Sequence, residues 1–164
     1  MKTTKTRREV IQAVEDNLDY LVRFAFFRVG NRQDAEDIVH SAIERLLTRD
    51  TTMTKTGTAR MYLFRTVNNA CLDFLRRQRP TQPAEGLDLA DTSDEDADLR
   101  EEARRINTLL DRLPGRESEV IRMRVVDELQ FVEIADILSI PATTAKSRFK
   151  SGMDRLRTLY NRQP

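Results

Sequence analysis

The stretch from Gln130 to Leu156 constrains the fold of this chain more than any other part of the sequence. Its first segment repeats apolar residues with the spacing of one buried helix face, namely Phe131, Ile134, Ala135 and Leu138. Ser139, Ile140 and Pro141 interrupt that pattern, and the fixed backbone angle of Pro141 suits the first turn of a new helix. The pattern predicts two helices joined by a tight turn.

The second of these helices, expected at about residues 142–157, has two chemically different sides. Its apolar side carries Ala145, Phe149, Met153 and Leu156. Hydroxyl groups and cations occupy or flank the other side: Thr143, Thr144, Lys146, Ser147, Arg148 and Lys150. Short polar side chains near the N-terminus of an exposed helix can reach base edges in the DNA major groove, while nearby cations neutralise phosphates. We therefore predict a DNA-binding helix-turn-helix; the alternative is an ordinary helical hairpin with a solvated charged face.

The composition favours an all-α protein, because 34% of the 164 residues are charged and only five Gly and five Pro interrupt the chain. No apolar run is long enough to span a membrane, and the first ten residues lack the apolar core of a signal peptide, so we expect a cytoplasmic protein. The single Cys71 and the single His40 exclude an internal disulfide and a His/Cys metal cluster. Without a Gly-rich phosphate loop or a nucleophile motif, neither enzymatic activity nor a cofactor is expected.

An acidic segment divides the sequence into two basic halves. Residues 80–98 contain seven acidic residues and no basic one, together with two prolines, a glycine and few large apolar side chains. Residues 1–79 carry 15 basic against 10 acidic residues, and residues 99–164 carry 13 against 10. Because the acidic segment cannot bury enough apolar surface to order itself, we predict a flexible linker at 80–98 between domains at 1–79 and 99–164.

Apolar periodicity predicts three helices around one small core in the first domain, at about residues 6–28, 34–47 and 59–79. Gly30 can adopt the left-handed angle that ends a helix, and Asn31 is a suitable N-cap for the next one. The second domain is expected to contain helices at about 99–113 and 116–126, separated by Pro114 and Gly115, followed by the helix-turn-helix. The apolar residues of the helix at 116–126 are Val120, Ile121, Met123 and Val125. The predicted fold is thus two small all-helical domains of three and four helices.

Three blocks of the sequence resemble one protein family. They are DAEDIVHSAIERLL at 34–47, MYLFRTVNNACLDFLRRQR at 61–79, and LPGRESEVIRMRVVDELQFVEIADILSIPATTAKSRFKSGMDRLR at 113–157. In this order and spacing they are similar to the two domains of extracytoplasmic-function (ECF) sigma factors of bacterial RNA polymerase. The resemblance implies a promoter-specificity subunit that binds core polymerase and promoter DNA, recognises the −35 and −10 elements and melts DNA locally, with an anti-sigma factor as a further partner.

The same resemblance implies roles for particular residues. The helix at 34–47 would bind the polymerase clamp through Asp34, Glu36, Asp37, His40, Ser41 and Glu44. The loop and helix at 48–79 would bind the −10 element through Lys55, Arg60, Tyr62, Arg65, Asn68, Asn69, Arg76 and Arg77, with the loop at 50–58 as the wall of a base pocket. The residues themselves are compatible with these roles, because acids can meet a basic partner, and arginines beside an aromatic ring can bind an unstacked nucleic acid. A solvated acidic face is the alternative for the first set, and a core position is expected for Phe64.

Some residues depart from the family pattern. Ser139 stands where the family usually has Gly in the turn, so we expect a strained or reshaped turn there. Gln130 replaces the usual Ser or Thr, which predicts a weaker helix cap. His40, Ser41 and Glu44 replace residues that are commonly Gln, Asp and Leu.

The alternative to a polymerase subunit is a free-standing helix-turn-helix regulator that binds an operator and uses its first domain to dimerise or to bind an effector.

Overall fold

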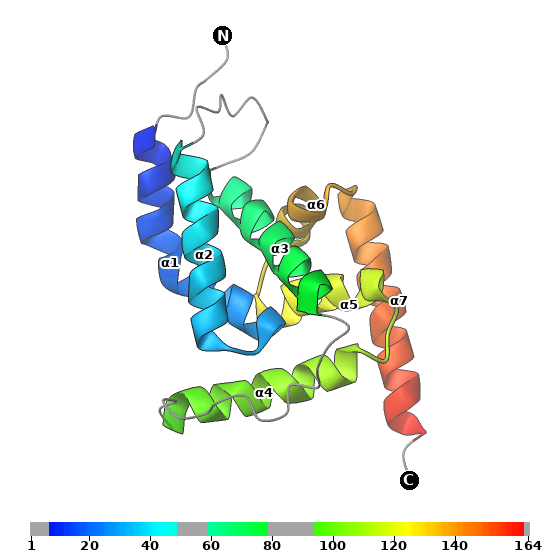
Figure 1. Cartoon of the computed structure of the whole chain (residues 1–164). Helices are drawn as coiled ribbons and strands as arrows, with labels where there is room; N and C mark the ends of the chain where they lie inside the picture. The colour runs from blue at the N-terminus through cyan, green and yellow to red at the C-terminus, as the bar shows by residue number, and fades with distance from the viewer. Residues whose placement is uncertain (1–6, 49–58, 79–93, 163–164) are drawn as a thin grey trace. The chain divides into compact units, whose positions relative to one another are not determined.

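The computed structural model describes residues 7–48, 59–78 and 94–162, and in these parts of the chain every regular element is helical (Figure 1). The chain divides into two compact units, residues 1–104 and 105–164. The elements are α1 (Arg7–Val29), α2 (Arg32–Thr48), α3 (Ala59–Gln78), α4 (Asp94–Leu110), α5 (Gly115–Ile121), the π-helical turn η1 (Arg122–Val126), α6 (Phe131–Leu138) and α7 (Ala142–Asn161). The predicted all-α fold with two small helical domains is confirmed.

Helix α4 begins earlier than the sequence pattern predicted. It starts at Asp94, whereas the helix was expected from residue 99, so the last five residues of the predicted linker are helical. The rest of the predicted linker, up to residue 93, lies outside the described residues.

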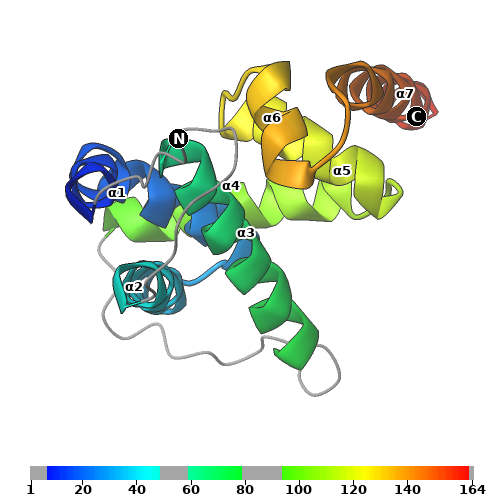
Figure 2. The same ribbon diagram turned by 90° about the horizontal axis from the view of Figure 1, so that it is seen from above.

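The first unit is built around the mutual packing of α1, α2 and α3. Helices α1 and α2 run antiparallel, and Figure 2 views α2 nearly along its axis with α3 beside it. Their shared core consists of fully buried large side chains: Leu21, Phe24, Phe27, Val39, Leu63, Phe64 and Val67. The ring of Phe64 makes edge contacts with Tyr20 and Phe24, each at 5.3 Å between centroids. The predicted three-helix core, with Phe64 inside it, is confirmed.

The connection between α1 and α2 has the chemistry that the sequence predicted. Gly30 adopts φ 78°, and its N–H donates to the carbonyl of Phe26 at 2.8 Å. The side-chain oxygen of Asn31 accepts a hydrogen bond from the N–H of Asp34 at 3.0 Å. One residue therefore ends the first helix and its neighbour caps the second.

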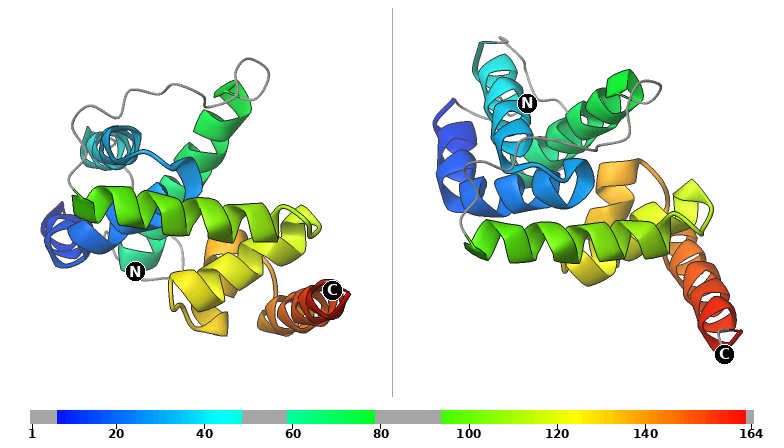
Figure 3. Two further views of the ribbon diagram at one scale, coloured as in Figure 1. Left: turned by 90° about the horizontal axis from the view of Figure 1, so that it is seen from below. Right: turned by 60° about the horizontal axis from the view of Figure 1, so that its bottom comes forward.

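In the second unit, α7 packs on α5 and α6, and it is the long helix that runs to the C-terminus in Figure 3. Leu110, Leu113 and Ile121 form a buried cluster, and partly buried apolar residues pack against it: Ile106, Phe149, Met153, Leu156 and Leu159. The aromatic rings of Phe131 and Phe149 join α6 to α7 with 5.4 Å between centroids. The apolar side predicted for the last helix is therefore the side that packs.

The helix predicted at 116–126 is α-helical only as far as Ile121 and continues as the π-helical turn η1. The N–H of Asp127 donates to the carbonyl of Arg122 at 3.1 Å, five residues back. The wider turn rotates the following side chains, so Met123 is buried while Val125, expected on the apolar face, is 56% exposed. Periodicity of 3.6 residues could not anticipate this change of pitch.

The turn between α6 and α7 has the left-handed residue that was expected. Ser139 adopts φ 57° and ψ 46°, and the N–H of Ile140 donates to the carbonyl of Ala135 at 3.0 Å. At the other end of α6, the N–H of Gln130 donates to the Glu133 carboxylate at 2.9 Å. A carboxylate three residues on thus binds the backbone at the helix start, so the unusual Gln130 is supported by its neighbour.

Replacing Ser139 by glycine should raise the free energy of unfolding of the second unit by about 0.5–1 kcal/mol, since glycine adopts positive φ without a steric penalty. Denaturant unfolding measured by circular dichroism checks this. Thr158→Gly is the matched control, because Thr158 is in the exposed, right-handed interior of α7, where glycine should lower stability by a similar amount. A Ser139→Gly protein that is less stable than the parent would contradict the assignment of strain to this turn.

Candidate functional site

Helix α7 carries the residues predicted to bind DNA on sides that the rest of the unit leaves open. Thr143, Lys146, Ser147 and Lys150 are exposed, and Thr144 and Arg148 are half-buried at the margin of the packed side. Ala145 is fully buried between them, and Phe149 packs on Phe131. Four of the six side chains are thus free to meet a ligand while the helix itself is held from behind.

A cation–aromatic contact joins helix α6 to the π-helical turn η1. The guanidinium of Arg124 lies 5.0 Å from the centre of the Phe131 ring, and its Nη1 donates to the carbonyl of Leu129 at 3.1 Å. Phe131 in turn packs on Phe149 of α7. A continuous set of contacts therefore runs from η1 through α6 to α7, which gives the helix-turn-helix a defined geometry.

A buried carboxylate that sequence inspection missed joins α5 to α7. Glu117 lies in the first turn of α5, and its carboxylate pairs with Nε of Arg155 at 3.0 Å and accepts a hydrogen bond from the Ser151 hydroxyl at 3.1 Å. Gly152, between these partners, is also buried. The signal in the sequence was a lone glycine seven residues after Ala145, on the apolar side of a helix, where close backbone approach is the usual reason for glycine.

The residues of α2 that were predicted to bind polymerase divide between two hollows of the first unit. Asp34, Asp37 and Ser41 line a hollow of about 370 Å³, together with Arg45 of α2 and with α3 residues that include Asp73 and Arg77. Glu36 and His40 line another, of about 520 Å³, with residues of α1. Glu44 is exposed on the same helix. The six residues are therefore all accessible, and they are distributed over more than one side of α2.

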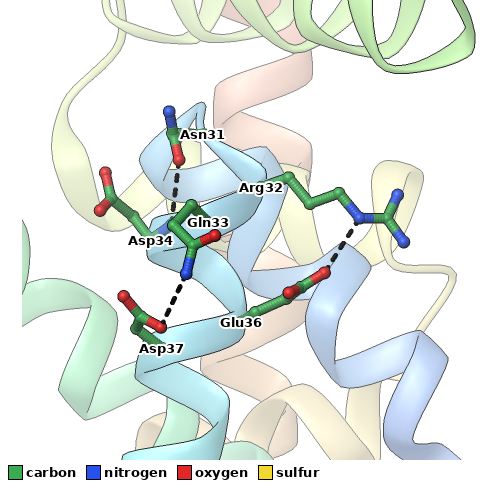
Figure 4. A network of polar contacts seen from close by, with 6 residues as sticks. All are labelled: Asn31, Arg32, Gln33, Asp34, Glu36 and Asp37. Carbon is green, nitrogen blue, oxygen red and sulfur yellow. Dashed lines mark hydrogen bonds and ion pairs between the residues drawn. The ribbon is translucent and has the colours of Figure 1, made fainter. Parts of the chain in front are cut away.

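Local contacts hold the acids at the start of α2 in place (Figure 4). Arg32 pairs with Glu36 at 3.0 Å, and the Gln33 amide donates to Asp37 at 3.2 Å. Asp34 lies on the side of α2 where Asp37 also lies, away from Glu36. Glu36 is thus already paired with a cation, whereas Asp34 and Asp37 are two neighbouring anions.

Burial, and secondarily the charge of Asp37, raises the pKa of Asp34 above its usual range. Ionised Asp34 is therefore less favourable in the folded protein than in the unfolded chain. The resulting loss of stability grows as pH rises through the carboxylate range and is complete above the pKa of the folded state. A cationic partner entering this hollow would relieve that penalty, so the hollow at Asp34 and Asp37 is suited to a basic group.

Helix α3 places the residues predicted to bind the −10 element in quite different surroundings. Arg60 donates from Nε to Asn17 at 3.2 Å, and its guanidinium lies 5.0 Å from the Phe64 ring centre, so it links α3 to α1. Tyr62 and Arg65 are half-buried, and Asn69, Arg76 and Arg77 are exposed. Lys55 and the predicted base-pocket loop at 50–58 lie outside the described residues.

Asn68 requires a correction to the predicted DNA-binding set. Its side chain is only 3% exposed, because it faces the core side of α3 next to Val67 rather than the charged side. Arg77 is in the last turn of α3, where it lines the hollow that contains Asp34 and Asp37. Its neighbour Arg76 pairs with Asp73 at 3.3 Å. As placed, Tyr62, Arg65 and Asn69 are the predicted residues of α3 best suited to meet a nucleic acid.

No group of three or more His, Cys, Asp or Glu side chains in the described parts of the chain is arranged to hold a metal ion. None of the described helices combines the length and apolar character required to cross a membrane.

Comparison with known proteins relates both units to one family. The family model of Sigma-70 region 2 matches residues 13–81, and that of Sigma-70, region 4 matches residues 109–158. The chain is 27% identical to RNA polymerase sigma factor SigV of Bacillus subtilis (strain 168) over 162 residues, covering 95% of this chain and 93% of that protein. It is 28% identical to ECF RNA polymerase sigma factor SigW of the same strain over 153 residues, covering 85% and 82%.

A solved structure shares the fold. The structure of CnrH in complex with the cytosolic domain of CnrY superposes on 98% of this chain and 92% of the solved one, with a TM-score of 0.67 at 19% sequence identity.

Proposed function

The chain belongs to the ECF group of the sigma-70 family of RNA polymerase sigma factors. From this premise we propose which of its residues bind core polymerase and which bind each promoter element. A sigma factor directs core polymerase to specific promoters and initiates transcription there. Sigma factors are regulatory subunits without a reaction of their own. In this chain, the first domain binds core polymerase and the −10 element, and the second domain binds the −35 element.

The observation that carries the proposal is the accessibility of α7. Thr143, Lys146, Ser147 and Lys150 are exposed on a helix whose other side is held by α5 and α6. An exposed helix of this kind fits the major groove, where hydroxyl groups and lysines near its N-terminus reach base edges and phosphates. We assign −35 recognition to this side of α7, together with the half-buried Thr144 and Arg148.

The acidic hollow of α2 supports the assignment of the polymerase contact. Asp34 and Asp37 are neighbouring carboxylates in a hollow large enough for side chains of a partner. Because the pKa of Asp34 is raised, a positively charged group of the partner would stabilise its ionised carboxylate. Basic groups of the polymerase clamp supply this chemistry. Ser41 lines the same hollow, and Glu36, His40 and Glu44, elsewhere on the same helix, complete the proposed contact.

For the −10 element, α3 offers a ring and two polar groups. Tyr62 can stack on an unpaired base, and Arg65 with Asn69 can bind the adjacent backbone or base edges. Arg76 and Arg77 add positive charge at the C-terminal end of α3. Because Arg60 is engaged with Asn17 and Phe64, its first role is to hold α3 on α1.

The partners follow from the family. Core polymerase and promoter DNA are the working partners, and an anti-sigma factor is a further one, since CnrH, which shares this fold, was solved in complex with the cytosolic domain of CnrY. All of these interactions belong in the cytoplasm.

Copurification with core polymerase tests the proposal. The purified chain should form a stoichiometric complex with core polymerase and start transcription from promoters that neither component uses alone. A free-standing regulator would bind its operator without copurifying with polymerase. Transcription start sites mapped across a genomic library, with and without the chain, provide the measurement.

Variants of α7 test the −35 assignment. Lys146→Ala should weaken promoter binding and reduce its dependence on salt by about one released counterion, because a phosphate contact is lost. Ser147→Ala and Lys150→Ala should instead change the preference at particular −35 bases. Unchanged binding, salt slope and base preference in all three proteins would exclude α7 as the DNA-contacting helix.

A further inference from the structure

Glu117 is a buried anion shared between two helices. Its side chain is 9% exposed, yet both carboxylate oxygens point to α7: Oε1 pairs with Nε of Arg155 at 3.0 Å, and Oε2 accepts from the Ser151 hydroxyl at 3.1 Å. These partners lie in consecutive turns of α7, 34 residues and more along the chain from Glu117. One carboxylate of α5 therefore binds α7 at two residues, Ser151 and Arg155.

Gly152 brings α5 and α7 unusually close at the same place. A Cβ atom at this position would lie 3.2 Å from Cβ of Glu117 and 2.5 Å from Cδ1 of Ile121. Real Cβ contacts are essentially never shorter than 3.0 Å. The two helices therefore touch across Gly152, and the carboxylate beside this contact opposes rotation of α7 about its own axis.

Ser151 and Arg155, the two residues that bind Glu117, share one side of α7 with residues that we assigned to DNA binding. Thr144, Arg148, Ser151 and Arg155 follow one another at i, i+4, i+7 and i+11, which is a single stripe along a helix. Glu117 holds the C-terminal two members of this stripe, and the N-terminal two lie at the margin of the proposed −35 surface. A rotation of α7 would exchange the side chains that face the bases, because successive helical residues are about 100° apart.

We propose that Glu117 is a positioning residue for −35 recognition: it sets the rotation of α7 and so determines which side chains face the bases. This inference rests on the proposed function of α7. Glu117 touches no DNA itself and acts through Ser151 and Arg155.

The same pairing adjusts the charge of the surface. Arg155 is 59% exposed, so its guanidinium is accessible to phosphate while Glu117 offsets its charge. Removing the anion leaves a free cation next to the DNA-binding side. Loss of Glu117 should therefore weaken discrimination between sequences and at the same time strengthen sequence-independent attraction to DNA. A residue that only stabilised the fold would not move these two quantities in opposite directions.

The test uses the full chain bound to core polymerase and a promoter library randomised at the −35 element. Glu117→Gln should reduce the preference for the best −35 sequence over a scrambled one about tenfold, comparable to losing one good base contact. It should also steepen the dependence of DNA binding on salt concentration by about 0.9 in the log–log slope, the effect of one additional phosphate contact. Ser151→Ala, which removes a single hydroxyl group, should reduce the preference less and leave the salt slope unchanged.

Glu119→Gln is the matched control, because it removes the same charge two residues further along α5, where the side chain points in another direction. This protein should keep the parental preference and slope. Melting curves followed by circular dichroism identify the temperature at which all variants are folded, and Ser151→Ala carries the test if Glu117→Gln melts too low.

Parental base preference in folded Glu117→Gln, or in Ser151→Ala where that variant carries the test, would overturn the inference while leaving the proposed function intact. A parental chain whose transcription does not depend on the −35 sequence would instead overturn the proposed function of α7.

Discussion

Replacing Glu36 and Asp37 together by lysine should weaken binding of the chain to core polymerase at least tenfold while the protein stays folded. Both acids lie off the buried side of α2, so the expected loss of stability is only about 1 kcal/mol, from the lost pairing of Glu36 with Arg32 and a poorer charge at the helix start. At a basic partner surface the same change opposes like charges. Such opposition costs several kcal/mol, and each 1.4 kcal/mol is tenfold in affinity.

The division of α2 between two hollows allows a sharper version of this experiment. Asp37→Lys alone changes the hollow that also contains Asp34, and Glu36→Lys alone changes the hollow that contains His40. The first hollow has three acids, Asp34, Asp37 and Asp73, whereas Glu36 in the second is already paired with Arg32. Asp37→Lys should therefore account for most of the lost affinity. Equilibrium competition for core polymerase against a labelled parental chain measures each variant.

Leu46→Ala is the control for effects that arise from unfolding. Leu46 is buried on the core side of the same helix, so its truncation should lower the free energy of unfolding by about 2–5 kcal/mol. It should impair function only in proportion to the unfolded fraction. A charge-reversed protein that remains folded and competes for polymerase with parental affinity would show that the acids of α2 are a solvated face.

Replacing Gly152 by valine should destabilise the second domain and lower −35-dependent transcription, with little effect on binding of core polymerase by the first domain. Even a Cβ atom here would lie 2.5 Å from Cδ1 of Ile121 and 3.2 Å from Cβ of Glu117, and valine adds two further methyl groups at this contact. Overpacking of this kind costs about 1–3 kcal/mol or more. A small domain is only marginally stable, so much of its folded population would be lost.

Gly152→Ala separates the clash from the ordinary preference of helices for alanine. Alanine is favoured over glycine in a helix by about 1 kcal/mol, and Gly115→Ala, whose Cβ would meet nothing within 4 Å, should show that gain in full or in part. Gly152→Ala should instead be destabilising. Combining it with Ile121→Val, which removes the clashing Cδ1 methyl group, should recover stability beyond the sum of the single effects. A Gly152→Ala protein as stable as Gly115→Ala would contradict the close approach of α5 and α7.

The sequence alone determined the helices and their inner faces, because these depend on local spacing. Apolar residues at 3.6-residue intervals located α1, α2, α3 and α6 to within about two residues, and also the start of α7, which runs on to Asn161 beyond its predicted end at residue 157. Gly30 with Asn31 marked the end of one helix and the start of the next. The exposed polar side of α7 followed from the same rule. A resemblance in three blocks, rather than any single contact, indicated the family to which the chain belongs.

The contacts between polar residues could not be predicted from the sequence, because they join positions that are far apart along the chain and depend on how the helices cross. Glu117 and Ser151 are ordinary surface-type residues until α5 and α7 touch across Gly152. Packing of α3 against its neighbours buries Asn68 and divides the acids of α2 between two hollows. The π-helical turn η1 escaped prediction for a related reason: its pitch departs from 3.6 residues, so apolar spacing placed Val125 on the buried side when it is exposed.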